Sequence, residues 1–157
     1  EALDKETARA VREKSPFSLI VLDVDFFKKV NDTYGHKCGD LVLQSLAKFL
    51  QENTRRSDIV CRFGGEEFVI LMPDAAVQDA FERAERFRKE FALQVVEHEG
   101  KHVKSTFSAG IASFPIHSDA GETLLSMADL ALYQSKADGR NRVTVFSPEM
   151  EEPSPVK

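Results

Sequence analysis

Two glycines separate two short apolar runs near the middle of the chain, and this pattern constrains the fold more than any other. The runs Ile59–Phe63 and Phe68–Leu71 flank Gly-Gly at 64–65. Strand-like runs joined by Gly-Gly are typical of a β-hairpin with a primed turn. Because glycine has no Cβ, a ligand can approach the backbone there. Glu66 and Glu67 follow and are expected on opposite faces of the second strand, although a solvated tight turn would contain the same residues.

A second pair of acids follows the apolar run Phe17–Leu22. A continuous apolar run of this length indicates a strand that is buried on both faces of a sheet. Asp23 and Asp25 would be costly to bury at its end unless they were paired or bound to a cation. Carboxylates suit Mg²⁺, which combines a few of them with substrate phosphates. Taken alone, each acidic site is better explained by a strand that ends in solvent. Taken together, Asp23 and Glu66 favour a site for one or two Mg²⁺ ions.

The composition indicates one globular domain. A chain of 157 residues, 42% hydrophobic and 30% charged, is long enough to bury its own core. The net charge of −5 argues against a nucleic acid polymer as the main partner, because no basic stripe can neutralise phosphates. Cys38 and Cys61 lack metal-binding spacing and favour a reducing compartment. No membrane span or signal peptide is evident, so the domain is expected in the cytoplasm, whereas the full-length protein can be membrane-anchored.

Hydrophobic periodicity predicts alternating strands and helices. Helices are expected at 2–14, about 40–54, from Pro73-Asp74 to Phe91 and about 121–137, with Gly139 ending the last one. Strands are expected at 17–22, within 59–72, at 103–114 and at 142–146. The order β-α-β-β-α-β predicts an α+β, ferredoxin-like fold. Residues 1–147 are expected to form the domain and residues 148–157 a disordered tail.

Four motifs follow one another along the chain. They are Asp23–Lys28, Asn31–Asp40, Arg62–Phe68 and Ala128–Arg142. In this order the chain resembles the GGDEF family of diguanylate cyclases, from about residue 17 to residue 146. The resemblance implies a nucleotide-cyclase palm, with a central, mainly antiparallel sheet flanked by helices. It also implies that two paired copies of the domain convert two GTP molecules to cyclic di-GMP and two pyrophosphates, with Mg²⁺ or alternatively Mn²⁺ as cofactor.

The resemblance assigns the metal site and the general base. Asp23, Glu66 and the Val24 carbonyl are expected to bind Mg²⁺, with Glu67 as a candidate further ligand. Two such ions can activate the 3′-hydroxyl of one GTP and stabilise charge on the α-phosphate of the other. Glu66 is the candidate base; it replaces the family's usual Asp, a change expected to be compatible with activity. Asp25 is expected to be structural rather than a ligand.

The resemblance also implies a phosphate site. The backbone N–H groups of Phe26, Phe27 and Lys28 are expected to hold phosphates, and the Lys28 amine to neutralise charge in the transition state. The side chains of both phenylalanines are expected in the core. Lys136 and Arg140 are expected to reach the β- and γ-phosphates. Cations at a helix end also complement the helix dipole, and one residue can serve both purposes.

The resemblance implies that Asn31, His36, Asp40 and Gly65 bind the substrate, whose base is guanine. Asp40 can accept from the guanine N1–H and N2 amine. Adenine lacks these donors, so ATP would leave a buried carboxylate unpaired. Without the other motifs, helix capping by Asp40 and loop bracing by His36 would explain both residues.

An RxxD pattern, Arg55 to Asp58, precedes the hairpin. In the family such a motif binds cyclic di-GMP and inhibits the enzyme. The planar fork of arginine can grip phosphate or the guanine edge, and Arg86 is a candidate second contact. A solvated turn is the alternative for the isolated pattern.

One family feature is missing. The usual D-x-L-T-G-L-x-N-R opening does not occur in residues 1–17. The domain is therefore expected to be truncated at its N-terminus and separated from an upstream regulatory domain; the alternative is that the protein lacks this opening. The rival interpretation is a non-catalytic module that binds GTP or cyclic di-GMP, which the presence of Glu66 and Glu67 disfavours. A third interpretation is a different nucleotide cyclase or a hybrid cyclic dinucleotide synthase. This interpretation depends on which base Asn31 and Asp40 select.

Overall fold

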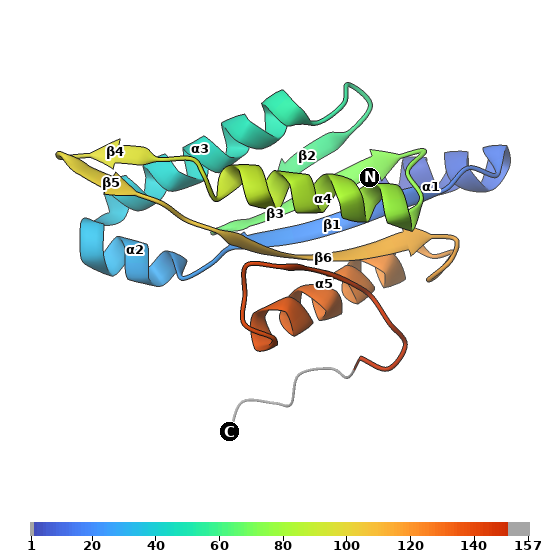
Figure 1. The fold of residues 1–157 in the computed structure, drawn as a ribbon. Helices are drawn as coiled ribbons and strands as arrows, with labels where there is room; N and C mark the ends of the chain where they lie inside the picture. The colour runs from blue at the N-terminus through green and yellow to red at the C-terminus, as the bar shows by residue number, and fades with distance from the viewer. Residues whose placement is uncertain (1, 151–157) are drawn as a thin grey trace.

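A five-stranded sheet with helices on both faces organises the chain (Figure 1). The computed structural model describes residues 2–150. The sheet strands are β1 (Phe17–Val24), β2 (Ile59–Arg62), β3 (Glu67–Pro73), β6 (Phe107–Phe114) and β7 (Val143–Val145). The helices are α1 (Ala2–Glu13), α2 (Phe27–Tyr34), α3 (His36–Asn53), α4 (Val77–Phe91) and α5 (Gly121–Ala137). A separate hairpin consists of β4 (Val96–His98) and β5 (Lys101–Val103).

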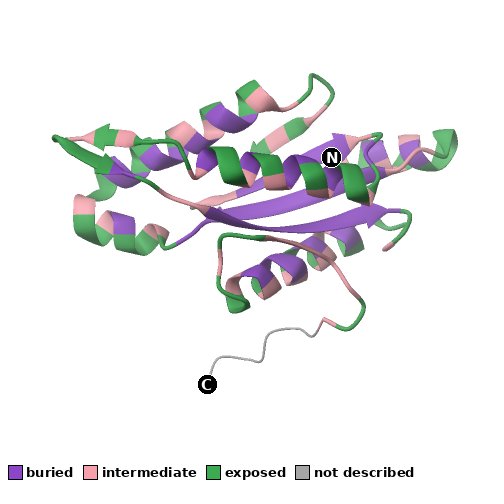
Figure 2. Ribbon diagram, in the orientation of Figure 1, coloured by how far each residue is buried: buried purple, intermediate pink, exposed green. Residues whose placement is uncertain are grey.

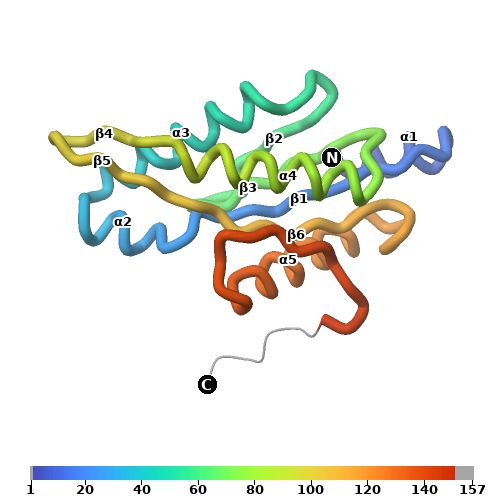
Figure 3. Tube along the Cα trace, in the orientation of Figure 1, coloured from blue at the N-terminus to red at the C-terminus, as the bar shows by residue number. Residues whose placement is uncertain are grey.

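The apolar run that the sequence predicts as a buried strand forms β1, at the centre of the strand order β2-β3-β1-β6-β7. β1 is antiparallel to both β3 and β6, and Asp23 at its end lies opposite Glu67 on one side and Ser108 on the other. β7 is parallel to β6, and Figure 3 shows the chain after α5 returning beside that strand. The prediction of an α+β fold with a mainly antiparallel sheet flanked by helices is confirmed.

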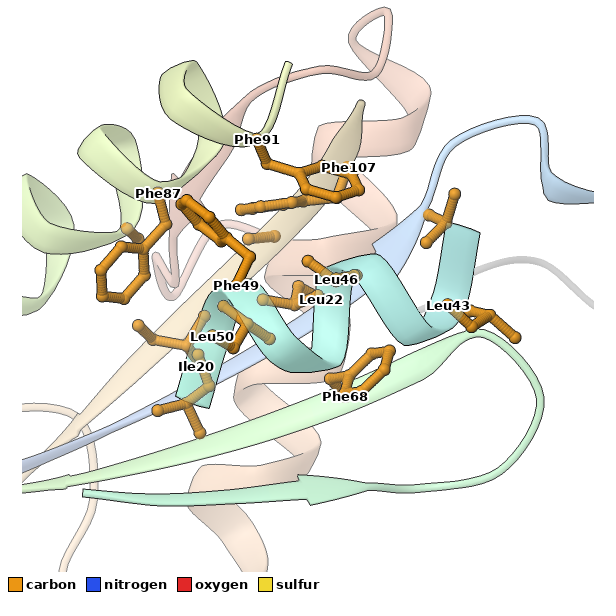
Figure 4. Packing of buried hydrophobic residues seen from close by; sticks show 14 of the residues in the cluster. Ile20, Leu22, Leu43, Leu46, Phe49, Leu50, Phe68, Phe87, Phe91 and Phe107 are labelled. Carbon is orange, nitrogen blue, oxygen red and sulfur yellow. The ribbon is translucent and has the colours of Figure 1, made fainter. Parts of the chain in front are cut away.

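Two hydrophobic cores lie on the two faces of the sheet, because successive β1 side chains point in opposite directions. Ile20 packs toward α3 and α4, whereas Val21 packs toward α1 and α5. Figure 2 shows burial along β1 and β6. Between the helices above the sheet, Phe49 packs edge-on against Phe87 with ring centroids 6.2 Å apart (Figure 4). β1, which ends at the acidic residues, therefore lies between two packed cores.

The predictions missed α2 and placed the start of α3 at residue 40 instead of 36. In α2 only Val30 is buried, so the segment lacks an apolar stripe. Gly35, with φ 92°, separates the two helices. A Cβ at Gly39 would lie 1.9 Å from Asn31 Oδ1, so the close packing of α2 against α3 requires glycine at this position.

The predicted strand 103–114 was wrong in its first part. β5 ends at Val103, residues 104–106 leave the ladder, and β6 begins at Phe107. The β4–β5 hairpin was missed because four of its six strand residues are polar and only Val103 is buried. α1, α4, α5 and the two sheet strands within 59–73 agree with the predictions, and Gly139 follows α5 with φ 121°. Most of the predicted tail lies outside the described residues. Within residues 2–150, no helix is long and apolar enough to cross a membrane.

Candidate active site

A pocket of about 490 Å³ lies where β1 ends, between the hairpin turn, the start of α2 and the end of α5. It is lined by Asp23, Val24, Phe26, Phe27, Lys28, Lys29, Asp32, Glu66, Lys136 and Arg140. The structure therefore brings together residues that are up to 117 positions apart, because Asp23 and Arg140 line the same pocket. The predicted metal and phosphate residues meet here, apart from Glu67, which is adjacent.

Asp23 is the buried carboxylate at the centre of this site. It lies on the sheet face that α5 covers, and Lys136 Nζ donates to its Oδ2 at 2.6 Å. Burial raises the pKa of Asp23, whereas the hydrogen bond and charge of Lys136 lower it, and the nearby Glu66 charge raises it further. The raised pKa is the net result, because one ammonium group does not offset the loss of water. Another cation at this position would complete the neutralisation.

The hairpin turn presents Glu66 to the pocket. The N–H of Phe63 donates to the Glu67 carbonyl at 2.8 Å, and the N–H of Glu67 donates to the Gly64 carbonyl at 3.0 Å. The loop therefore consists of three residues, 64–66, and is one residue longer than the predicted Gly-Gly turn. Both glycines have positive φ, 109° at Gly64 and 46° at Gly65, as the Gly-Gly sequence permits.

Glu67 begins β3 opposite Asp23, on the face that α5 covers. Burial raises the pKa of Glu67, and the charges of Asp129 and Asp23 raise it further. Asp129 on α5 was not identified from the sequence, since only the fold brings it near the hairpin. Among residues 2–150, no three Asp, Glu, His or Cys side chains form a closed metal cage. The available donors are oxygens, which fit a hydrated Mg²⁺ that also takes substrate phosphates as ligands.

The start of α2 supplies backbone donors to the same pocket. Phe26 is the N-cap residue, with φ 54° and no side-chain hydrogen bond capping the helix. The first N–H groups of a helix have no partner within the helix and favour anions. Phe27 packs partly into the core as predicted. The core prediction for Phe26 is wrong, because its side chain is 60% exposed and its ring lies 4.8 Å from the Arg140 guanidinium.

The predicted guanine residues lie farther along the α2–α3 pair. Asn31 is on α2, and its side chain lies against Gly39, the residue before Asp40. His36 and Asp40 are exposed on α3. The capping alternative for Asp40 is wrong, because α3 begins at His36 after the N-cap residue Gly35. None of the three lines the pocket that holds Asp23.

The RxxD segment lies away from this pocket, between α3 and β2. The Asp58 carboxylate is fully buried, pairs with Arg83 of α4 and accepts the N–H of Arg55 at 2.7 Å. The Arg55 side chain is exposed. Arg86 is also exposed, with its guanidinium 5.3 Å from the Phe87 ring. Arg83 was missed, although it falls on the apolar side of α4 beside Ala80 and Phe87, where a charged residue indicates a buried partner.

The comparisons with known proteins agree with this geometry. The sequence profile of the family described as "Diguanylate cyclase, GGDEF domain" matches residues 1–142. Diguanylate cyclase A of Treponema denticola is 40% identical over 133 residues, which is 85% of this chain and 36% of that protein. Response regulator PleD of Caulobacter vibrioides is 44% identical over 143 residues, 90% of this chain and 32% of PleD. The chain thus spans about a third of the length of these curated relatives.

Solved structures are similar over nearly the whole chain. The active GGEEF domain of a diguanylate cyclase from Vibrio cholerae has a TM-score of 0.85 and 35% identity, covering 92% of each chain. The GGDEF domain of DgcB from Caulobacter crescentus in complex with c-di-GMP has a TM-score of 0.85 and 34% identity, covering 92% of this chain and 85% of that one. The chain therefore belongs to the GGDEF domain family of diguanylate cyclases.

Proposed function

We propose that this domain condenses two GTP molecules into cyclic di-GMP and releases two pyrophosphates. One observation carries the proposal: the carboxylates of Asp23 and Glu66 and the cationic groups of Lys28, Lys136 and Arg140 line one pocket at the end of β1. Carboxylates next to cations suit a metal-bound polyphosphate, since each charge on the ligand then has a counterpart on the protein. The similarity to an active GGEEF domain supports activity with glutamate at position 66.

Asp23, Glu66 and the Val24 carbonyl would hold Mg²⁺, with Glu67 as a candidate further ligand and Mn²⁺ as an alternative ion. Bound there, the metal supplies positive charge that stabilises the attacking and leaving oxygens. Lys136 exchanges its ion pair with Asp23 for a phosphate oxygen when substrate binds. Glu66 accepts the proton of the 3′-hydroxyl, and its position in the turn places it beside the end of β1.

The remaining cations neutralise the phosphates. The N–H groups at the start of α2 and the Lys28 amine bind phosphate oxygens, and Arg140 reaches the outer phosphates from the end of α5. Lys28 is well placed to do so, because its side chain is 91% exposed and its contact with Asp32 is a surface pair at 3.3 Å. Lys28 can therefore leave Asp32 for a phosphate at little cost.

Guanine binds between α2 and α3 in this proposal. Asn31 and Asp40 pair with its edge, His36 contributes a further substrate contact, and Gly65 lets the substrate approach the hairpin turn. The fixed packing of Asn31 against Gly39 supports this assignment, because it holds one recognition group in place before substrate arrives. A hybrid cyclic dinucleotide synthase differs only in this step, and ATP competition would identify it.

Cyclic di-GMP inhibits the enzyme through Arg55, Asp58 and Arg86 in this proposal. The Asp58 carboxylate forms a buried ion pair with Arg83, so the groups that can contact a ligand directly are the exposed Arg55 and Arg86 side chains. The cyclic di-GMP bound in the DgcB structure supports product binding by a domain of this type. Cytoplasmic location and regulation by an upstream domain stay predictions.

Each domain binds one GTP, so synthesis requires two copies that face each other. The test is GTP turnover with Mg²⁺ across a dilution series of the chain, with the product identified by mass spectrometry. If the isolated domain is monomeric, we expect cyclic di-GMP to form at a rate that rises faster than linearly with protein concentration. For a monomeric domain, a rate strictly proportional to concentration would contradict the pairing. Product binding without any turnover would favour the non-catalytic module.

A further inference from the structure

We infer that Asp25 is a positioning residue for Arg140. Its carboxylate holds the loop after α5 in the conformation that presents the Arg140 guanidinium to the GTP phosphates. The inference rests on the proposed function, because that function assigns Arg140 to the phosphates. Asp25 lies two residues beyond Asp23 but is 3% exposed and does not line the substrate pocket. Its carboxylate faces the loop that carries Arg140.

The Asp25 carboxylate joins two segments that are distant in sequence. Thr106 Oγ1 and Ser108 Oγ, at the start of β6, each donate to it at 2.6 Å. The backbone N–H of Asn141 donates to it at 2.9 Å and also lies 3.1 Å from Ser108 Oγ. Hydrogen bonds to an ionised carboxylate are stronger than neutral ones. We call this group of four residues the Asp25 anchor; it ties the backbone next to Arg140 to the adjacent ends of β1 and β6.

The loop needs such an anchor because of its backbone conformation. Arg140 and Asn141 are consecutive non-glycine residues with left-handed backbone, φ 66° and 48°. A Cβ disfavours this conformation, which persists only where surrounding contacts impose it. The Arg140 N–H is fixed by the Ser135 carbonyl at 2.9 Å, and the Asn141 N–H is fixed by Asp25. Without Asp25, we expect the second of these residues to relax and carry Arg140 away from the pocket.

The residue that follows Asp25 supports the side chain of Arg140. Phe26, which also has positive φ at 54°, places its ring 4.8 Å from the Arg140 guanidinium carbon. Asp25 therefore fixes the backbone of Asn141 while Phe26 stacks against Arg140. Among the described residues, no hydrogen bond or ion pair occupies the Arg140 guanidinium, so its donors remain free for phosphate.

A double-mutant cycle tests whether Asp25 acts through Arg140. Asp25→Asn keeps the size of the side chain and one acceptor oxygen, so it removes the charge with the least disturbance to folding. We expect Asp25→Asn to raise KM for GTP about tenfold when Arg140 is present, and less than about twofold in an Arg140→Ala background, with kcat changing less than KM. Equal increases in the two backgrounds would overturn the inference. Asp119→Asn, an exposed acid in the β6–α5 loop, is the matched charge control.

Hydrogen exchange of the Asn141 amide tests the Asp25 anchor without nucleotide. We expect exchange to accelerate at least about tenfold in Asp25→Asn and to stay slow in Arg140→Ala and Asp119→Asn. Unchanged protection in Asp25→Asn would overturn the inference even if KM rose. A failure of the proposed function can be distinguished from a failure of the inference on Asp25. Absence of cyclic di-GMP synthesis by the wild type would refute the proposed function, whereas the exchange experiment would still test the Asp25 anchor.

Discussion

Two ion pairs with buried carboxylates lie beneath the two predicted ligand sites, and they differ in how far they are closed. In the pair of Asp58 with Arg83, the side chains are 0% and 8% exposed, and Asp58 also accepts the Arg55 N–H. In the pair of Asp23 with Lys136, they are 12% and 31% exposed and border a pocket that also holds Glu66. The first pair is enclosed by protein, whereas the second opens on a site where a ligand can replace either partner.

The difference shows which pair can change partners. A buried pair that loses one member leaves an unpaired charge away from water, which is strongly unfavourable. Asp58 and Arg83 are therefore expected to stay together and to shape the RxxD turn. Asp23 already carries a raised pKa because Lys136 does not fully offset its burial. A metal for Asp23 and a phosphate for Lys136 would both improve the electrostatics of the open pair.

The largest expected effect comes from the carboxylate of the open pair. Asp23→Asn should reduce the rate of cyclic di-GMP formation by about a thousandfold, because an amide neither holds a divalent cation well nor pairs with Lys136. The measurement is initial-rate turnover of GTP with Mg²⁺. Asp119→Asn removes an exposed acid and should leave the rate unchanged. A rate for Asp23→Asn within about tenfold of the wild type would show that the open pair is not the active site.

The next effect compares the two cations directly. Arg83→Ala should lower the free energy of unfolding by about 3 kcal/mol, because it strands the fully buried Asp58 carboxylate. Lys136→Ala should lower it by no more than about 1 kcal/mol, because this cation is partly solvated and can be replaced by water. Urea denaturation of both variants gives the comparison. Equal losses of stability would remove the distinction between a closed and an open pair.

Arg55 tests whether the exposed side of the closed pair binds product. Arg55→Ala should raise the cyclic di-GMP concentration for half-inhibition about tenfold, because one charge-assisted contact with the ligand is lost. Inhibition curves at fixed GTP provide the measurement, and Arg56→Ala, the exposed neighbouring arginine, is the control. Identical curves for the two variants would place product inhibition elsewhere.

The smallest effect concerns a half-buried polar group, His117, which is held by a neutral hydrogen bond. His117 Nδ1 accepts the N–H of Ser113 at 2.9 Å, and burial lowers the pKa of His117. The folded state therefore resists protonation, so the free energy of unfolding is unaffected above the usual histidine pKa of about 6.5 and falls as the pH drops below it. His117→Asn should remove this component, so that the free energy of unfolding falls less between pH 7.5 and pH 5.5 than it does in the wild type. An unchanged pH dependence would show that His117 does not titrate in this way.

The elements with a strong pattern were predictable from the sequence. β1 follows its apolar run, the hairpin follows its Gly-Gly pair, and α4 and α5 follow their apolar stripes. α2 was not predictable, because it buries little besides Val30 and because its N-cap residue, Phe26, has a left-handed conformation. The β4–β5 hairpin was missed for the same reason, since its polar residues show no alternation.

The candidate site shows the same division. The motifs contain every residue that lines the pocket except Lys29, but they do not reveal how these residues pair. Neither the contact of Asp23 with Lys136 nor that of Asp58 with Arg83 follows from local sequence, because the partners are 113 and 25 positions apart. The role of Asp25 is hidden for the same reason, since its donors come from 81 to 116 positions away. Phe26 was predicted in the core from its apolar character, but its contact with Arg140 brings it to the surface of the pocket.

A comparison of the wild type with Glu66→Gln tests most directly whether the pocket at the end of β1 is the active site. Cyclic di-GMP formation from GTP and binding of added cyclic di-GMP are measured on the same samples. We expect Glu66→Gln to reduce turnover by at least about a thousandfold, because the base and one metal ligand are lost together. Binding of cyclic di-GMP should be retained, because Arg55 and Arg86 lie away from the pocket. Turnover by Glu66→Gln at the wild-type rate would contradict the assignment of the pocket at the end of β1 as the active site.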